Sequence, residues 1–305
     1  MKALGLSFGR KMKNSEILVK QVLKRMEERG YETQFIRMLD LDIKDCSGCS
    51  ACVGNLLGGG AGKCVLKDDF PIVEEAILEA DALVVCAPIY VWAPSGLFKT
   101  ICDRMGPSHD LAFRVNAVET AKAMGKEPAV DPRAFKRRAA AYLTVGGART
   151  KNWTSLGLAQ MYEIGSMGLD VVDAVNVYAT MDYQHVLGDE KAMARMTAVG
   201  DHLADALETE GGLDKWYGDE GVCPVCHMDL LTILPEGNKV ECPVCGIEGT
   251  LNLIDGKISV EFSEAQQKRS RVNYDGKYEH YVEIRDSVAS MQMIPDLAER
   301  LKEYE

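Results

Sequence analysis

Short apolar runs alternate with longer amphipathic stretches along the first two thirds of the chain. Apolar runs of strand length occupy residues 2–8, 33–38, 82–87, 139–145 and 170–178. Between them, apolar residues recur every three or four positions, which is typical of helices that cover a sheet. Continuous apolar runs indicate strands buried on both faces of a parallel sheet. The pattern therefore predicts an α/β fold in which helices cover a five-stranded parallel sheet.

Two aromatic residues follow the third of these strands. Pro88 ends the apolar run, and Tyr90 and Trp92 come before a new helix that starts near Ser95. In an open α/β sheet, ligands bind beyond the carboxyl ends of the central strands. The aromatics therefore indicate a flat, conjugated ligand at this edge. The alternative is a loop that only closes over the core.

The loop at residues 9–14 lies between the first strand and a helix predicted over about 15–29. Unpaired N–H groups and the helix dipole favour an anion at such a position. Arg10, Lys11 and Lys13 add positive charge, and hydroxyl groups stand at either side of the loop. The segment predicts a phosphate site. The alternative is an ordinary capped helix with a solvated basic turn.

Four cysteines follow the second strand. Cys46, Cys49 and Cys52 stand at every third position, and Cys64 comes after a glycine-rich interval. Such spacing lets thiolates converge on one iron–sulfur cluster, because a cubane needs four sulfur ligands and the glycines let the chain fold back. A redox disulfide and a zinc site are the competing interpretations.

A second group of four cysteines stands near residue 230. Cys223 and Cys226 form one Cys-Pro-Val-Cys knuckle, and Cys242 and Cys245 form another after fifteen residues. This is the spacing of a four-cysteine metal ribbon, for which zinc is the first expectation. The knuckles also resemble those of rubredoxins, so a single iron ion is the alternative.

Composition narrows the classes of protein that remain. The chain has 305 residues, 47% of them hydrophobic, which is enough for a large core. Its net charge of −11 disfavours a nucleic-acid partner. We find no signal peptide and no apolar run long enough to span a bilayer, so we expect a cytoplasmic protein without a membrane partner. In such a chain, closely spaced cysteines indicate metal ligands.

The segment from Ala87 to Tyr90, together with Ser95–Lys99 and the Asp103-Arg104 pair, resembles the NAD(P)H-dependent FMN reductases and iron–sulfur flavoproteins of the flavodoxin-like superfamily. The likeness covers about residues 1–212. It extends to the phosphate loop, where Phe8 stands in place of the usual proline and the loop is one residue longer. It also extends to the first cysteine group, where the gap before the fourth cysteine is longer than usual.

The resemblance implies an FMN site formed by three segments of the chain. In the family, one loop holds the FMN phosphate, the segment after the third strand lies against the isoalloxazine ring, and a Gly-Gly turn lies beside its pyrimidine. Carried over by motif, the FMN contacts are Ser7, Phe8, Arg10, Lys11, Asn14, Ser15, Pro88, Ile89, Tyr90, Val91, Trp92, Thr144, Val145, Gly146 and Gly147.

The same resemblance implies the metal centres and the chemistry. It favours a [4Fe-4S] cluster on Cys46, Cys49, Cys52 and Cys64, and NAD(P)H as co-substrate. No catalytic side chain is predicted, because hydride transfer to a flavin requires no protein acid or base. We expect the first cysteine group to lie on the same sheet edge as the Pro88–Trp92 segment, since both follow carboxyl ends of parallel strands.

The sequence thus predicts three units. Residues 1–212 form a flavodoxin-like, doubly wound five-stranded parallel sheet, with an insertion at 106–135 expected to act as a lid or oligomer contact rather than as core. Residues 213–262 form the metal ribbon and 263–305 a helical tail. The insertion, the tail and the family's habit lead us to expect a homodimer or homotetramer.

The predicted function is that of an FMN oxidoreductase. Electrons would pass from NAD(P)H through FMN, and through the cluster where one is held, to a quinone-like or other small-molecule or protein acceptor. Two alternatives remain open. One is a single-electron carrier linked to ferredoxin, and the other is a non-catalytic regulatory or scaffold module.

Overall fold

The computed structural model describes residues 1–305, with the exception of the Ser166 side chain. Its main sheet is parallel and has the order β2-β1-β3-β5-β6. The strands are β1 (Lys2–Ser7), β2 (Glu32–Arg37), β3 (Ala82–Tyr90), β5 (Arg138–Val145) and β6 (Leu169–Val177). The two-residue strand β4 (Ala93–Pro94) pairs with the end of β3 in the antiparallel sense. This order confirms the predicted doubly wound, flavodoxin-like sheet, whose switch point lies between β1 and β3.

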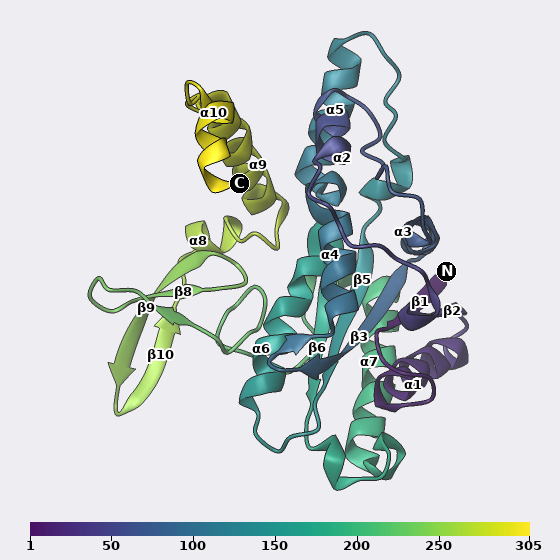
Figure 1. Cartoon of the computed structure of the whole chain (residues 1–305). Helices are drawn as coiled ribbons and strands as arrows, with labels where there is room; N and C mark the ends of the chain where they lie inside the picture. The colour runs from purple at the N-terminus through teal and green to yellow at the C-terminus, as the bar shows by residue number, and fades with distance from the viewer.

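Helices cover both faces of the sheet (Figure 1). One face carries α1 (Asn14–Glu28) and α7 (Glu190–Glu208), and the other carries α3 (Phe70–Glu79), α4 (Gly96–His109) and α6 (Asn152–Met161). In β1, Leu4 and Leu6 pack toward α3 and α4, whereas Ala3 packs toward α1. Successive strand residues point to opposite faces. Both faces are buried, which is why the apolar runs in the sequence are continuous.

The predicted insertion at 106–135 forms a small core of its own. It begins at a kink in α4 at Gly106 (φ 27°) and continues as α5 (Leu111–Ala123). Phe113 of α5 is buried with Leu56 of α2 (Ala51–Leu57) and with Tyr281 of α9 (Tyr274–Ala289). The segment thus packs in a small cluster outside the two cores of the main sheet, and its role as a lid or oligomer contact stays a prediction.

The C-terminal part forms a second, antiparallel sheet of order β10-β9-β8-β7, followed by helices. Its elements are β7 (Thr232–Ile233), β8 (Lys239–Cys242), β9 (Ile247–Ile254), β10 (Lys257–Glu261), α8 (Glu264–Lys268), α9 and α10 (Leu297–Leu301). The ribbon lies beside the main domain in Figure 1. Tyr162, just after α6, donates a hydrogen bond from its hydroxyl to the Cys226 carbonyl over 2.7 Å, which links the two parts. Among the residues described, no helix combines the length and apolar character that crossing a bilayer demands.

Candidate functional site

Three of the predicted segments meet at one edge of the main sheet. They follow the carboxyl ends of β1, β3 and β5, which are neighbours in the sheet. Ligands of open α/β sheets bind at this edge. The structure thus brings together the loop at 8–13, the β3–β4 hairpin and the Gly146–Gly147 turn, as the sequence predicted.

The loop after β1 places a helix start beside basic side chains. Lys13 stands directly before the first turn of α1, and its side chain makes no capping hydrogen bond. The backbone N–H groups of that turn face the loop, and Lys13 does not occupy them. Arg10 and Lys11 are exposed, and Ser15 is buried at the helix start. The loop lies tight against the helix, because a Cβ on Gly9 would stand 2.6 Å from the Ser15 hydroxyl. This arrangement suits a phosphate group.

The other predicted residues of this loop have structural partners. Ser7 is buried, and its hydroxyl accepts a hydrogen bond from the Gly9 N–H over 3.4 Å. The side-chain Oδ1 of Asn14 accepts a hydrogen bond from the Val186 N–H over 3.1 Å. Phe8 is buried, with its ring edge-on to Phe98 at 5.1 Å between centroids. Its side chain is therefore part of the core, and only its backbone remains for a ligand.

Glu16, in the first turn of α1, contacts the loop through the Met12 N–H and was not predicted from the sequence. Its side chain is fully buried and accepts hydrogen bonds from the Met12 N–H at 3.1 Å, Arg37 at 2.8 Å and Lys20 at 2.6 Å. Burial alone would raise the pKa of this carboxyl, but the pairs with Arg37 and Lys20 lower the pKa to about 2. An acidic residue in a first helical turn is common, so the sequence held no signal that this one is special.

The β3–β4 hairpin presents the predicted aromatic residues at a strained tip. Val91 and Trp92 have φ values of 47° and 70°, the left-handed region that two-residue hairpins require and that Asn-Gly usually supplies. A β-branched residue there is unusual, and such strain is concentrated at functional sites. Tyr90 is 56% exposed and Trp92 52%. Pro88 and Ile89 are buried, so the exposed contacts come from the three residues at 90–92.

Trp92 has an aromatic partner that the sequence did not assign to the site. Its ring lies edge-on to that of Trp153, at the start of α6, with 5.7 Å between centroids. Trp153 is 38% exposed. The pair forms an aromatic wall beside the Gly146–Gly147 turn.

The turn after β5 requires glycine at Gly146, whereas at Gly147 the exposed Met181 side chain could move aside. A Cβ on Gly146 would stand 2.3 Å from the Thr154 methyl, and one on Gly147 would stand 2.6 Å from the Met181 side chain. Met181 is exposed, and its apolar side chain lies next to Gly147. The side chains of Thr144 and Val145 are buried in β5, so this segment offers a ligand its backbone.

The first cysteine group surrounds a cavity against α4. Cys46 and Cys49 are exposed, Cys52 and Cys64 half-buried, and all four line a cavity of about 190 Å³ together with residues 103–108. In the described part of the chain, their sulfurs do not form a group close enough to share one ion. Ligands of a cubane bind different irons and so stand further apart than ligands of one ion. The four thiols around this cavity are therefore the residues that could hold a [4Fe-4S] cluster.

These cysteines do not lie at the flavin edge of the same chain. The cavity meets α4 at residues 103–108, roughly 10 Å or more along the helix from its start at Gly96. Arg104 donates to the Lys44 carbonyl over 2.8 Å, which fixes the chain before Cys46 beside this part of α4. Helix α2 lies next to α5 in Figure 1. The expectation that both loops share one edge is wrong, because the cysteine segment folds back along α4 after it leaves β2.

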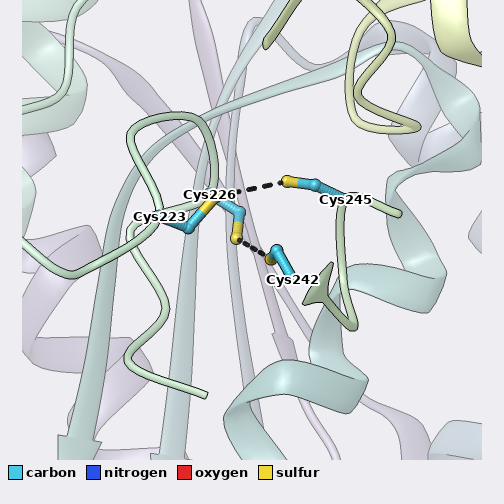
Figure 2. Close-up of side chains that lie close together, drawn as sticks. All are labelled: Cys223, Cys226, Cys242 and Cys245. Atoms are coloured by element: carbon cyan, nitrogen blue, oxygen red, sulfur yellow. Dashed lines mark hydrogen bonds between the residues drawn. The ribbon is translucent and has the colours of Figure 1, made fainter. Parts of the chain in front are cut away.

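The second cysteine group converges on one point. Cys223, Cys226, Cys242 and Cys245 are buried, and their sulfurs lie within 4.8 Å of one another (Figure 2). The Cys223–Cys245 and Cys226–Cys242 sulfur distances are 3.7 and 3.5 Å. A tetrahedral ion with metal–sulfur bonds of about 2.3 Å requires sulfur separations of about 3.8 Å. The group therefore fits a single metal ion.

Comparison with known proteins agrees with this geometry. The family model for NADPH-dependent FMN reductases matches residues 1–183. A flavone reductase of known structure is 26% identical, with a TM-score of 0.80 and coverage of 100% of this chain and 96% of that one. Flavone synthase cfoJ of Aspergillus candidus is 29% identical over 84% of this chain and 79% of its own length. An iron–sulfur flavoprotein of Archaeoglobus fulgidus is 33% identical over 34% of this chain, which spans 48% of that relative.

Proposed function

Because this chain belongs to the NADPH-dependent FMN reductase family, we propose that it transfers electrons from NAD(P)H through FMN to a planar, conjugated ketone of the flavone type. Family membership makes it an NAD(P)H-dependent flavin oxidoreductase. The identity of the acceptor is the proposed part. The observation that carries it is the full-length likeness to a flavone reductase, which includes the C-terminal part.

The names of the two long relatives narrow the substrate class. One is named for reducing a flavone and the other for making one, so flavone is the compound that their names share. The exposed rim of Tyr90, Trp92, Trp153 and Met181 supports the same class here, since flat aromatic molecules stack on aromatic side chains. A two-electron reduction would add a hydride and a proton across the ring double bond of such an acceptor.

The chain's own residues would hold and orient the cofactor. Arg10, Lys11 and the start of α1 bind the phosphate, while Tyr90 and Trp92 contact the ring. The backbone N–H groups of the Gly146–Gly147 turn lie beside the pyrimidine, where they favour negative charge. FMN supplies the hydride chemistry when bound. No side chain is assigned as an acid or base.

We also propose which metals the chain binds, the compartment in which it works and its oligomeric state. The ribbon at 213–262 binds zinc, with a single iron ion as the alternative, and the first cysteine group binds a [4Fe-4S] cluster. All ten cysteines are free thiols, which supports a reducing, cytoplasmic compartment. The exposed apolar rim and the exposed tail after residue 284 support a homodimer or homotetramer.

A second candidate function follows from the cavity that the first cysteine group lines. A cluster there would let the protein exchange single electrons with a carrier such as ferredoxin, without direct use of NAD(P)H.

An anaerobic turnover assay tests both candidates. FMN-loaded protein is mixed with NADPH or NADH and a flavone, and the product mass is measured by chromatography. We expect a product two hydrogen atoms heavier, formed in step with NAD(P)H oxidation. NAD(P)H oxidation without any reduced flavone would contradict the proposed acceptor. Reduction of the flavin by reduced ferredoxin, but not by either nucleotide, would support the second candidate.

A further inference from the structure

A buried arginine stands at the wall of the cavity that the first cysteine group lines. Arg104, in the middle of α4, is only 2% exposed. It pairs with the Asp68 carboxylate, which is equally buried, and it donates to the Lys44 carbonyl over 2.8 Å. Its guanidinium lies over the Phe70 ring at 4.6 Å. These contacts fix the side chain in one orientation.

One N–H donor of this guanidinium has no acceptor among the described residues. Within the described part of the chain, the Arg104 Nε–H is buried and has no hydrogen-bond partner. A buried donor without a partner destabilises the folded chain, and more so when it belongs to a charged group. Such a group in a native structure calls for an explanation, for example an ion or cofactor that satisfies it.

The proposed sulfur ligand nearest to this guanidinium along the cavity wall is Cys64. Arg104 and Cys64 line the same cavity. An arginine side chain in a protein keeps its positive charge and has no acceptor atom. Arg104 is thus a permanent cation close to a sulfur ligand of the proposed cluster.

We propose that Arg104 is a positioning residue for the [4Fe-4S] cluster, donating its free N–H to a cluster or cysteine sulfur and raising the reduction potential of the cluster. One-electron reduction adds a negative charge to a cluster. Hydrogen bonds to the sulfurs and nearby positive charge stabilise that charge, which makes reduction easier. Arg104 would thereby make the cluster easier to reduce by one electron. The inference rests on the proposed cluster and not on the proposed flavone substrate.

The reduction potential of the reconstituted cluster tests this role. The full chain is loaded anaerobically with ferrous iron and sulfide, iron and sulfide are counted per chain, and the potential is measured by dye-mediated titration with electron paramagnetic resonance. Arg104→Lys keeps the positive charge but removes the Nε–H donor and the two guanidinium nitrogens that donate to the Asp68 carboxylate. We expect it to bind the cluster with a potential below that of the unaltered chain. Arg133→Lys, at an exposed pair with Glu75, is the matched control and should leave the potential unchanged.

If Arg104→Lys fails to bind the cluster, its potential cannot be measured, so a second variant is needed. Asp68→Asn leaves Arg104 in place without its compensating charge, so the potential should rise. Potentials equal to that of the unaltered chain in both variants, at full iron content, would overturn the inference. So would an unaltered chain that takes up no iron and sulfide. A chain without iron that still reduces flavone would overturn this inference alone and leave the proposed function intact.

Discussion

The two groups of four cysteines differ in how each is built. In the ribbon, two knuckles bring four buried sulfurs within 4.8 Å of one another. In the loop between β2 and α3, four exposed or half-buried cysteines line a cavity of about 190 Å³ against α4. The ribbon brings its four cysteines together with its own hairpins, whereas residues of α4 complete the wall of the cavity beside the loop. The first group could hold one ion, and for the second we propose a cluster.

The largest effect should follow the loss of a ribbon cysteine. Cys242→Ser removes one of four ligands, and structural zinc contributes about 10–16 kcal/mol to the folding of small zinc domains. We expect loss of the bound ion and rapid proteolysis within residues 213–262, while FMN stays bound. Metal analysis and limited proteolysis check both effects.

Cys52→Ser is the matched control from the other group. It should lower the iron and sulfide content but leave the ribbon ion and its protease resistance in place. If both variants lost the same metal, or if Cys242→Ser kept its ion, the two groups would not be independent centres.

The next largest effect concerns the aromatic hairpin. Trp92→Ala removes the ring that packs on Trp153 and that we assign to the flavin. We expect the Kd for FMN to rise about tenfold, which corresponds to about 1.4 kcal/mol. Fluorescence titration of the apoprotein measures it. Trp216→Phe, in the linker stacked on His227, should leave the affinity unchanged. Unaltered FMN binding and turnover in Trp92→Ala would remove Trp92 from the site.

A smaller effect should appear in the pH dependence of stability. The pKa of Glu16 is about 2 in the folded chain and near 4.5 as a free side chain, so folding favours its ionised form. The stabilisation is fully present above about pH 4.5 and is lost as the pH falls toward 2. Glu16→Gln should be less stable at neutral pH and lose less stability on acidification between pH 5 and 2.

Urea unfolding at several pH values measures the Glu16 effect. Glu28→Gln, an exposed residue on the same helix, should follow the unaltered chain. Equal slopes of stability against pH for Glu16→Gln and the unaltered chain would show that Glu16 does not anchor the loop.

The smallest effect concerns the contact between ribbon and sheet domain. Tyr162→Phe removes the hydroxyl that donates to the Cys226 carbonyl, which contributes about 1 kcal/mol. We expect faster hydrogen exchange in the ribbon without loss of its ion. Tyr304→Phe, at a fully exposed ring, is the control. Unchanged exchange in Tyr162→Phe would mean that this hydrogen bond does not help to hold the ribbon against the sheet domain.

The sequence predicted what depends on local pattern. Continuous apolar runs indicated a buried parallel sheet, and the Cys-Pro-Val-Cys spacing indicated a single-ion site, because both features are formed by neighbouring residues. Contacts between distant segments left no such signal. Trp153, Met181 and Arg104 join their sites through packing, and Phe8 turned out to pack in the core. The FMN contacts themselves stay predictions.

One anaerobic titration tests the central claim that this sheet edge binds FMN which NAD(P)H reduces. Purified chain is titrated with FMN and then with NADPH or NADH while the flavin absorbance is followed. We predict one FMN per chain and bleaching of its absorbance by about one equivalent of nucleotide. A chain that binds no FMN, or whose bound flavin neither nucleotide bleaches, would contradict the account.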